Sequence, residues 1–328
     1  MKAWRMPRLG DPWQELEPAE ITPPEPGPGA VRIRVEATDL NFADILQCRG
    51  SYQVKRTPPF TPGMNAAGTV VAAGPGAAVV PGIRLVGPTV APAGGFAEEA
   101  LLAEALSHPI PDAVDTTDAM GVHITHGTAW LALHHRARLQ PGETVLVLAA
   151  AGGVGSAAVA MAHRHACWVV AAAGGPDKAA FAARAGADAV IDYTNDDLYE
   201  SVMALTDGRG VDVVFDPVGG RYFDVARRLL AWEGRLLVIG FASGEIPSAP
   251  ANHALVKNYA VVGVHMGGYR ERRPDLVRRC YADLHEQLAA GEIAEQISET
   301  IGFEALPGAL ARLASRDTTG RVIFDPLR

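Results

Sequence analysis

The chain has 328 residues, of which 48% are hydrophobic and 20% are charged, and its formal net charge at pH 7 is −8. This composition is typical of a globular protein with two domains and excludes an intrinsically disordered chain. The acidic balance argues against a nucleic-acid-binding protein, which needs a basic domain or stripe. The three widely spaced cysteines favour a reducing compartment, and residues 1–10 lack the apolar core of a secretion signal, so we expect a cytoplasmic protein.

The first 120 residues are predicted to be rich in β-strands. Residues 31–36 alternate between apolar and polar side chains, which is the pattern of a half-buried strand. Between residues 58 and 95, prolines and glycines recur in pairs and triplets. Short strands separated by such turns favour a β-barrel or sandwich.

Beyond residue 120 the pattern changes to apolar strands that alternate with alanine-rich helices. This alternation predicts a doubly wound parallel sheet whose faces are both covered by helices, with its last strand at an edge. The predicted strands are 144–149, 168–173, 189–192, 211–216, 235–239 and 260–264. The predicted helices between them are 152–166, 176–185, 196–206 and 220–231.

The last part of the chain is expected to return to the first domain. It contains a predicted helix over 274–290 and predicted strands near 296–302 and 321–324. Residues 145–162 carry no charge over 18 positions, which is the length of a membrane span. Their glycine and alanine content instead favours a strand, a glycine turn and a helix, so we expect no membrane segment.

The turn between the first strand and the first helix of this α/β region has the spacing of a dinucleotide-binding loop. It reads A-x-x-G-x-x-G from Ala149, through Gly152, Gly153 and Val154, to Gly155. Gly152 would let the backbone approach a pyrophosphate, and Gly155 would let the helix pack closely on the strand. The helix N-terminus then offers free N–H groups to the phosphates. The alternative is a tight turn that binds no ligand.

The end of the second strand bears on the choice of nicotinamide cofactor. NAD-binding proteins usually place an acidic residue there, but residues 171–175 contain none. An absent carboxylate permits the 2′-phosphate of NADP, with which Lys178 can pair. Asp177 is a competing candidate, and a solvated lysine at the start of a helix is the alternative interpretation of Lys178.

Taken together, these motifs resemble the medium-chain dehydrogenase/reductase superfamily, and specifically its zinc-free quinone oxidoreductase branch. The resemblance implies an α/β Rossmann domain, 121–264, inserted into a β-rich GroES-like barrel domain made of 1–120 and 265–328. It also implies NADPH as cofactor and a homodimer in which the strand 260–264 joins its two-fold mate. The matching stretches are 40–44, 50–52, 62–64, 138–143, 149–155, 210–220, 240–247 and 257–258.

The resemblance also assigns residues to two parts of a site. On the acceptor and nicotinamide side it implies the catalytic residues Asn41, Tyr52 and Thr125. For the cofactor it implies contacts to the pyrophosphate, the 2′-phosphate and the nicotinamide, and a basic residue in the tail. The residues implied for the cofactor are Ala149, Gly152, Gly153, Val154, Gly155, Lys178, Tyr193, Phe241, Val264 and Arg321.

No metal site is expected. Zinc-dependent relatives have a cysteine where this chain has Asn41, and a His-Glu pair where it has Met64 and Asn65. Three distant cysteines do not form a structural four-thiolate site either. His123 and His126 can share a helix face, but two histidines make no closed metal site. A further departure from the family pattern is Gly174, which stands near where relatives often have a serine for the 2′-phosphate.

The sequence therefore predicts an NADPH-dependent reductase that transfers hydride to a quinone or a related enone without a metal. Asn41 and Tyr52 are the expected hydrogen-bond donors to the acceptor oxygen. An enoyl-thioester or 2-enal reductase is the alternative enzyme, in which Tyr52 donates a proton. A non-catalytic member, crystallin-like or RNA-binding, and a zinc alcohol dehydrogenase are less favoured by the acidic charge, the intact glycine loop and the missing ligands.

Overall fold

The computed structural model describes residues 1–294 and 296–328 and consists of two compact units. The first unit comprises Met1–His123 and Tyr281–Arg328, and the second comprises Ile124–Cys280. The second unit therefore ends sixteen residues beyond the predicted limit of 264, because it includes the helical segments that follow the last strand.

The second unit is built on a parallel sheet of six strands. Their order across the sheet is β10-β9-β8-β11-β12-β13, which is the doubly wound order of a Rossmann domain. The first strand, β8, lies in the middle, and the order reverses between β8 and β11. The strands are β8 (Thr144–Leu148), β9 (Trp168–Ala173), β10 (Ala189–Asp192), β11 (Val211–Asp216), β12 (Leu230–Val238) and β13 (Ala260–Gly263).

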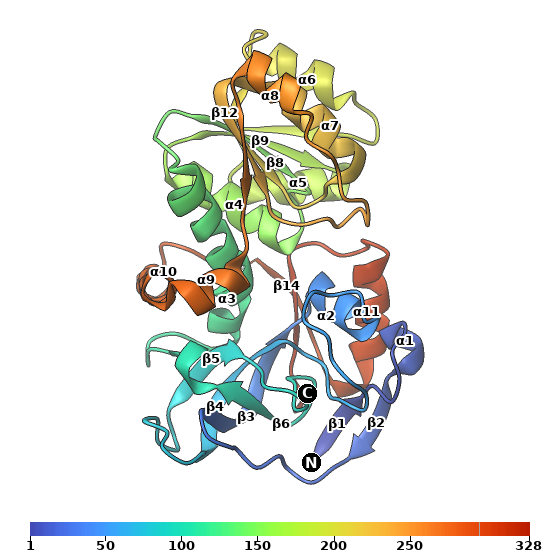
Figure 1. Cartoon of the computed structure of the whole chain (residues 1–328), viewed down its shortest axis with the longest axis vertical. Coiled ribbons are helices and arrows are strands. Elements are labelled where there is room, and N and C mark those ends of the chain that lie inside the picture. Colours follow the sequence, from blue (N-terminus) through green and yellow to red (C-terminus); the bar gives the residue numbers. More distant parts are fainter. Residues whose placement is uncertain (295) are drawn as a thin grey trace. The chain divides into compact units, whose positions relative to one another are not determined.

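Helices cover both faces of this sheet, as the uniformly apolar strands require (Figure 1). One face forms an apolar cluster with α6 and α7 that includes Leu146, Val170, Val202 and Phe223. Right-handed crossovers place α4 and α5 on the opposite face, against β8, β9 and β10. The helices are α4 (Gly153–Arg164), α5 (Pro176–Arg184), α6 (Leu198–Leu205), α7 (Gly220–Leu229), α8 (Ala251–Lys257) and α9 (Met266–Arg272).

Most predicted elements of this unit are confirmed to within two residues, but one boundary was wrong. Residues 145–162 are divided between β8 and α4, as expected for a strand, a turn and a helix. The helix predicted over 220–231 ends at Leu229, and β12 begins at Leu230 instead of at Arg235. Leu230 is buried and pairs with Val211, after which the pairing shifts before Val213 meets Arg235. A short apolar run of this kind fits a strand as well as a helix, so its pattern did not reveal the boundary.

The first unit is β-rich, as predicted, and has the organisation of a GroES-like domain. A sheet of seven strands has the order β14-β15-β3-β4-β5-β7, and β6 also pairs with β3; β1 and β2 form a separate pair. The strands are β1 (Lys2–Arg5), β2 (Glu17–Glu20), β3 (Ala30–Asp39), β4 (Asn65–Ala73), β5 (Arg84–Pro88), β6 (Glu99–Ala103), β7 (His108–Pro109), β14 (Ile297–Ile301) and β15 (Arg321–Phe324).

The C-terminal segment completes this unit, which confirms the predicted return. Strand β15 pairs antiparallel with β3, and β14 pairs with β15. Helix α11 packs beside α2 and α1 over a cluster of buried aromatic and aliphatic side chains (Figure 1). The helical segments of this unit are α1 (Pro12–Glu15), α2 (Phe42–Cys48), η1 (Glu104–Leu106), η3 (Phe303–Ala305) and α11 (Leu306–Ala314). Two further helices, α3 (Thr116–Trp130) and α10 (Pro274–Ala289), cross the division between the units, and η2 (Leu131–Ala137) belongs to the second unit.

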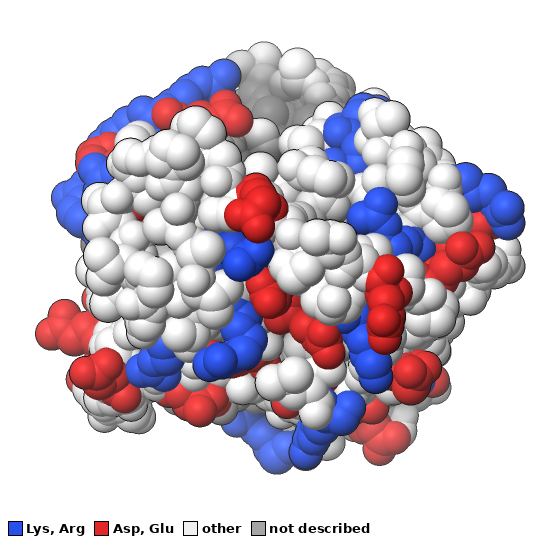
Figure 2. Space-filling model, turned by 90° about the horizontal axis from the view of Figure 1, so that it is seen from below, with Lys and Arg blue, Asp and Glu red and all other residues white. Residues whose placement is uncertain are grey.

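Two observations bear on whether the protein has a membrane segment or a basic nucleic-acid-binding surface. Within residues 1–294 and 296–328, no helix combines the length and the apolar character needed to cross a bilayer. On the face shown in Figure 2, basic and acidic side chains lie interspersed instead of forming a basic stripe.

Candidate functional site

The glycine turn after β8 has a backbone geometry that the neighbouring strand holds in place. Ala149 has a φ of +48°, and its carbonyl accepts a hydrogen bond from the Gly152 N–H at 2.9 Å. The Ala150 N–H donates to the Ala172 carbonyl of β9 at 3.0 Å. The turn is therefore anchored at the carboxyl end of the central strands, where doubly wound sheets bind their ligands.

The two glycines of the motif differ in the space that the protein leaves for a side chain. A Cβ atom on Gly155 would lie 2.3 Å from the Ala149 carbonyl oxygen, so the turn itself excludes any side chain there. A Cβ on Gly152 would have its nearest neighbour at 3.4 Å, and the φ of Gly152 is −80°. The protein therefore leaves room for a side chain at Gly152, and any need for glycine at this position comes from what binds outside the turn.

The N-terminus of α4 faces the same turn. The first backbone hydrogen bond into the helix is donated by Ser156 to the Gly152 carbonyl, at 2.8 Å. The N–H groups of Gly153, Val154 and Gly155 precede it and have no acceptor within the helix. Together with the helix dipole, they form the kind of backbone site that binds phosphate. These residues fit the pyrophosphate of a dinucleotide.

Gly174, at the end of β9, is explained by its neighbour Tyr193. A Cβ on Gly174 would lie 3.0 Å from the Tyr193 hydroxyl oxygen, and the ring atoms of Tyr193 lie almost as close. The tyrosine hydroxyl therefore occupies the space beside Gly174 into which a serine side chain would extend. Tyr193 in turn packs against Tyr222 of α7, with 5.2 Å between the ring centroids.

An acidic residue that the sequence analysis missed lies at the same point. Asp192, the last residue of β10, accepts hydrogen bonds from the Gly175 N–H at 2.7 Å and from the Thr194 hydroxyl at 2.6 Å. Asn195 binds its other oxygen at 2.9 Å. The Thr194 hydroxyl, followed by the Gly175 N–H, lowers the pKa of Asp192 to about 2. No carboxylate stands at the end of β9 itself, but one from the adjacent strand reaches its last turn.

Cationic and aromatic groups also lie near this edge of the sheet. Lys178 is the third residue of α5 and is half-buried, whereas Asp177 is exposed. Arg221 donates to the Tyr222 hydroxyl at 3.0 Å and lies over the Tyr222 ring. Arg221 and Tyr222 had no assigned role in the sequence analysis, because a charged helix start gives no distinctive sequence signal.

The loops after β11 and β12 bring Phe241 to the same edge. The buried carboxylate of Asp216 accepts the N–H groups of Val218 and Gly219, which fixes the turn after β11. A Cβ on Gly219 would lie 2.9 Å from a ring carbon of Phe241. Val264 follows β13, and its N–H donates to the Val238 carbonyl at 3.0 Å. The structure therefore places these two predicted nicotinamide neighbours directly after the carboxyl ends of β12 and β13.

In the first unit, Asn41 is held by a buried arginine from the C-terminal segment. Arg321 Nη1 donates to Asn41 Oδ1 at 3.0 Å, and Arg321 Nη2 forms an ion pair with buried Asp39. Asn41 Nδ2 is buried and has no hydrogen-bond acceptor among the described residues. Arg321 thus orients the amide so that its N–H₂ group remains available as a donor. The contacts observed for Arg321 are internal, and a contact to the cofactor stays a prediction.

Asp44 completes this buried polar network. Its two oxygens accept the N–H groups of Asn41, at 2.9 Å, and of Met64, at 2.8 Å. Burial, reinforced by the nearby charge of Asp39, raises the pKa of Asp44 to about 7. The carboxyl group therefore ties the start of α2 to the segment before β4.

The structure places the other two predicted catalytic residues on different elements. Tyr52 is half-buried on the loop after α2, and its N–H donates to the Leu46 carbonyl at 3.1 Å. Thr125 lies buried in α3, where its hydroxyl oxygen is 3.2 Å from His126 Nδ1. The ring of His123 instead stacks on Tyr281, with centroids 4.5 Å apart. In the described part of the chain, no group of three or more His, Cys, Asp and Glu side chains is placed to bind a metal ion.

Comparisons with known proteins agree with this arrangement. The alcohol dehydrogenase GroES-like domain model matches residues 27–112, and the zinc-binding dehydrogenase model matches residues 153–282. The chain is 39% identical to quinone oxidoreductase-like protein 2 of Bos taurus over 307 residues, which are 93% of this chain and 87% of the relative. A homologue from Nematostella vectensis is 38% identical over 91% of this chain and 82% of its own length. This chain belongs to the quinone oxidoreductase branch of the medium-chain dehydrogenase/reductase superfamily.

Solved structures of this superfamily resemble the chain over nearly its whole length. A mycobacterial protein complexed with NADPH is 30% identical, with a TM-score of 0.91 and coverage of 99% of this chain and 100% of the other. The quinone oxidoreductase of Escherichia coli complexed with NADPH is 26% identical, with a TM-score of 0.89 and the same coverage. A 2-haloacrylate reductase is 26% identical, with a TM-score of 0.86 and full coverage of both chains.

Proposed function

We propose that this oxidoreductase transfers hydride from NADPH to a quinone or a related conjugated carbonyl compound without a metal ion. The observation that carries the proposal is the pair of donor sites already described. One is the set of backbone N–H groups of Gly153–Gly155, which have no acceptor within α4, and the other is the Asn41 amide that Arg321 orients. The NADPH-bound relatives and the quinone oxidoreductase-like relatives support the choice of cofactor and acceptor.

Bound NADPH supplies the hydride, and the protein positions the reactants and stabilises the developing charge. The N–H groups of Gly153, Val154 and Gly155 bind the pyrophosphate, with Ala149 and Gly152 shaping the turn. Phe241 and Val264, after the ends of β12 and β13, are proposed to border the nicotinamide ring. Each of these groups is held by backbone hydrogen bonds of the sheet and its turns, so little reorganisation is needed on binding.

Asn41 acts as the proposed hydrogen-bond donor to the acceptor oxygen. Its Oδ1 is occupied by Arg321, so its Nδ2 is the atom that donates as negative charge develops on the acceptor. Tyr52 is proposed as a second donor or as a proton donor, and Thr125 as a residue on the nicotinamide side. The positions corresponding to zinc ligands are Asn41, Met64 and Asn65, which do not form a catalytic zinc site.

NADPH is proposed over NADH because Lys178, near the start of α5, and the Tyr193 hydroxyl are proposed to contact the 2′-phosphate. Asp192 opposes this preference through its charge, although its oxygens are already occupied by Gly175, Thr194 and Asn195. The proposed preference for NADPH over NADH therefore depends on the balance between the attraction of Lys178 and the repulsion of Asp192 for the 2′-phosphate. Replacing Lys178 with alanine should weaken NADPH binding and leave NADH binding nearly unchanged.

Two neighbouring functions remain as alternatives within the proposal. The resemblance to a 2-haloacrylate reductase supports reduction of a conjugated carbon–carbon double bond, as an enoyl-thioester or 2-enal reductase performs it. In that case Tyr52 supplies the proton. A non-catalytic cofactor-binding member would bind NADPH but oxidise none of it in the presence of these acceptors.

We also propose that the protein is a cytoplasmic homodimer. Within the described residues, β13 is the edge strand of the six-stranded sheet, and exposed apolar side chains lie on it and on α8, which precedes it, including Val261, Leu255 and Val256. An apolar sheet edge pairs readily with another chain, and two-fold closure makes the contact isologous. Sedimentation at micromolar concentration should give twice the mass of one chain. The three cysteines are all buried and form no disulfide, which agrees with a reducing compartment.

The test is an acceptor panel assayed for loss of NADPH absorbance. Simple quinones, enones, 2-enals and crotonyl thioesters are compared with wild-type protein, Asn41→Leu and Tyr52→Phe. We expect quinone or enone turnover, with kcat/KM for Asn41→Leu lowered about ten- to a hundred-fold, because a charged hydrogen bond of roughly 1.5–3 kcal/mol is lost. Absence of turnover with every acceptor would contradict the proposed activity.

A further inference from the structure

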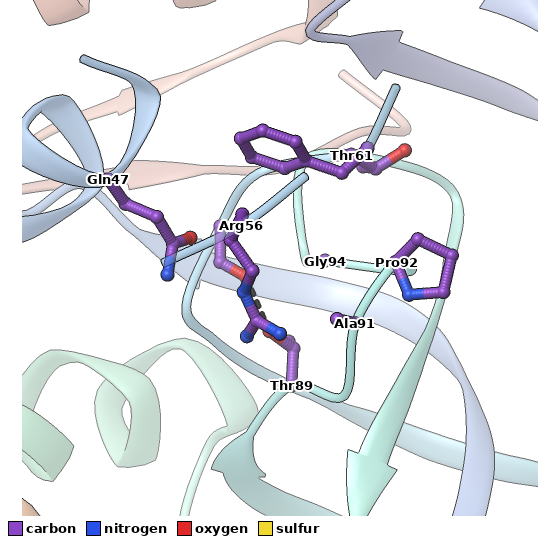
Figure 3. Close-up of a pocket in the computed structure, with 9 residues that line it drawn as sticks. Gln47, Arg56, Thr61, Thr89, Ala91, Pro92 and Gly94 are labelled. Carbon is purple, nitrogen blue, oxygen red and sulfur yellow. Dashed lines mark hydrogen bonds between the residues drawn. The ribbon is translucent and has the colours of Figure 1, made fainter. Parts of the chain in front are cut away.

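A small cavity in the first unit lies beside the end of α2 and is separate from the Asn41 amide. It is bounded by α2, by the loop that follows α2, by the segment just before β4 and by the segment just after β5 (Figure 3). All of its walls belong to the first unit. The residues that line it are Gln47, Arg56, Phe60, Thr61, Gly63, Thr89, Ala91, Pro92 and Gly94.

Two hydrogen-bond donors in this cavity have no acceptor among the described residues. Gln47 is 3% exposed, and its Nε2 atom has no hydrogen-bond partner among the described residues. Arg56, on the same loop as Tyr52, is half-buried, and no described residue forms a salt bridge or a hydrogen bond with its guanidinium. Figure 3 shows both side chains extending into the cavity.

The remaining polar groups of the cavity leave these donors unmatched. The Thr89 hydroxyl donates to the Gly63 carbonyl at 2.8 Å, and the Thr61 hydroxyl oxygen accepts from Arg5 at 3.5 Å. No carboxylate is among the lining residues. Burial alone lowers the pKa of Arg56, with no neighbouring charge contributing. The cavity therefore carries a partly desolvated positive charge and a buried amide N–H₂ without a compensating acceptor from the protein, so a water molecule or a ligand must supply one.

We propose that Arg56 and Gln47 bind a carboxylate group of the acceptor substrate, so that the enzyme prefers conjugated carbonyl compounds that carry a carboxylate. This inference rests on the proposed function and names its substrate class. A planar carboxylate matches the fork of a guanidinium and leaves an oxygen for the amide N–H₂. The cavity has a volume of about 10 Å³ and apolar walls formed by Phe60, Ala91 and Pro92, so at most the carboxylate end of the acid enters it.

The position of the cavity connects it to the proposed acceptor site. Asn41 precedes the first residue of α2 and Gln47 is near its last, so about 9 Å of helix axis separates them. The loop after α2 carries both Tyr52 and Arg56. The proposal therefore places the carbonyl oxygen of one short conjugated acid at Asn41 and its carboxylate at Arg56.

The test compares acetylacrylate, a carboxylate-bearing enone, with its methyl ester. In wild-type protein we expect kcat/KM for the acid to exceed that for the ester. Arg56→Gln should lower kcat/KM for the acid about ten- to a hundred-fold, mostly through KM, because charge-assisted hydrogen bonds are lost. The ester should change less than about two-fold. Arg56→Lys should restore part of the loss, and Gln47→Leu should reduce turnover of the acid more than that of the ester.

Lys55→Gln is the matched control. Lys55 is an exposed cation next to Arg56 in the chain, and its ammonium group donates to the Gly50 carbonyl. The Lys55→Gln substitution removes one positive charge, as Arg56→Gln does. It should leave the ratio of kcat/KM for the acid to kcat/KM for the ester unchanged. An equal fall in kcat/KM for the acid in Lys55→Gln and Arg56→Gln would show general electrostatic attraction and would overturn the proposed site.

A binding experiment separates this inference from the proposed function. Levulinate, the saturated acid, and its methyl ester are titrated into wild-type and Arg56→Gln protein. Binding of the acid that requires Arg56 supports the carboxylate site even if no acceptor is reduced. Reduction of quinones together with equal binding and turnover of acid and ester, unaffected by Arg56→Gln, would overturn the carboxylate site and leave the proposed function standing.

Discussion

The two regions that carry the candidate site are built in different ways. At the carboxyl edge of the six-stranded sheet, the proposed phosphate-binding groups are backbone N–H groups, held by a turn and a helix start that are consecutive in sequence. In the first unit, Asn41 is the proposed hydrogen-bond donor to the substrate. Its orientation depends on a side chain from a distant segment, because Arg321 lies 280 positions further along the chain. The first region depends on glycine and backbone geometry, and the second depends on a buried polar network.

This difference makes the network in the first unit the more sensitive to a single substitution. Arg321→Met should destabilise the protein by about 3–5 kcal/mol, because it leaves the buried carboxylate of Asp39 without its partner. Arg312→Met is the control, since Arg312 pairs with Glu299 where both side chains are more than 40% exposed, and it should cost at most about 1 kcal/mol. Urea unfolding measures the free energy of unfolding of both variants. Equal losses of stability would refute the importance of the buried ion pair.

Substitutions of the two glycines of the turn should separate effects on folding from effects on cofactor binding. Gly155→Ala should lower the free energy of unfolding by about 1–3 kcal/mol, because the new Cβ meets the Ala149 carbonyl. Gly152→Ala should leave the melting temperature nearly unchanged and weaken NADPH binding at least about ten-fold, since only a bound pyrophosphate would meet its Cβ. Thermal melting and NADPH titration of both variants provide the data. A stable Gly155→Ala, or unchanged NADPH affinity in Gly152→Ala, would contradict this assignment.

Asp44 should give the buried network a pH dependence. The pKa of Asp44 in the folded protein, about 7, lies above its ordinary value of 3.8, so the folded protein retains a proton that the unfolded chain has lost. Its contribution to stability is complete below about pH 4 and is lost as the pH rises through 7, by up to about 1.4 kcal/mol per pH unit. Urea unfolding between pH 5 and 7 should therefore show a flatter profile in Asp44→Asn than in wild-type protein, and parallel profiles would rule out this titration.

The same contrast explains how much the sequence could predict. The six strands, their doubly wound order and the turn 149–155 follow from apolar runs, glycine spacing and local rules, and the structure confirms them. Asp192 was missed because it reaches the last turn of β9 from a neighbouring strand, and a one-dimensional pattern does not show which strand neighbours which. The Arg321–Asn41 contact was missed for the same reason. The start of β12 at Leu230 was missed because its register shifts between Val211 and Val213.

The most direct test of the central claim is an isothermal titration of the wild-type protein with NADPH and with NADH. The account predicts one NADPH site per chain and weaker binding of NADH, because Lys178 and Tyr193 are proposed to contact the 2′-phosphate. Failure of both cofactors to bind would contradict the assignment of the glycine turn as a dinucleotide site. Binding of NADH as tightly as NADPH would contradict the proposed cofactor.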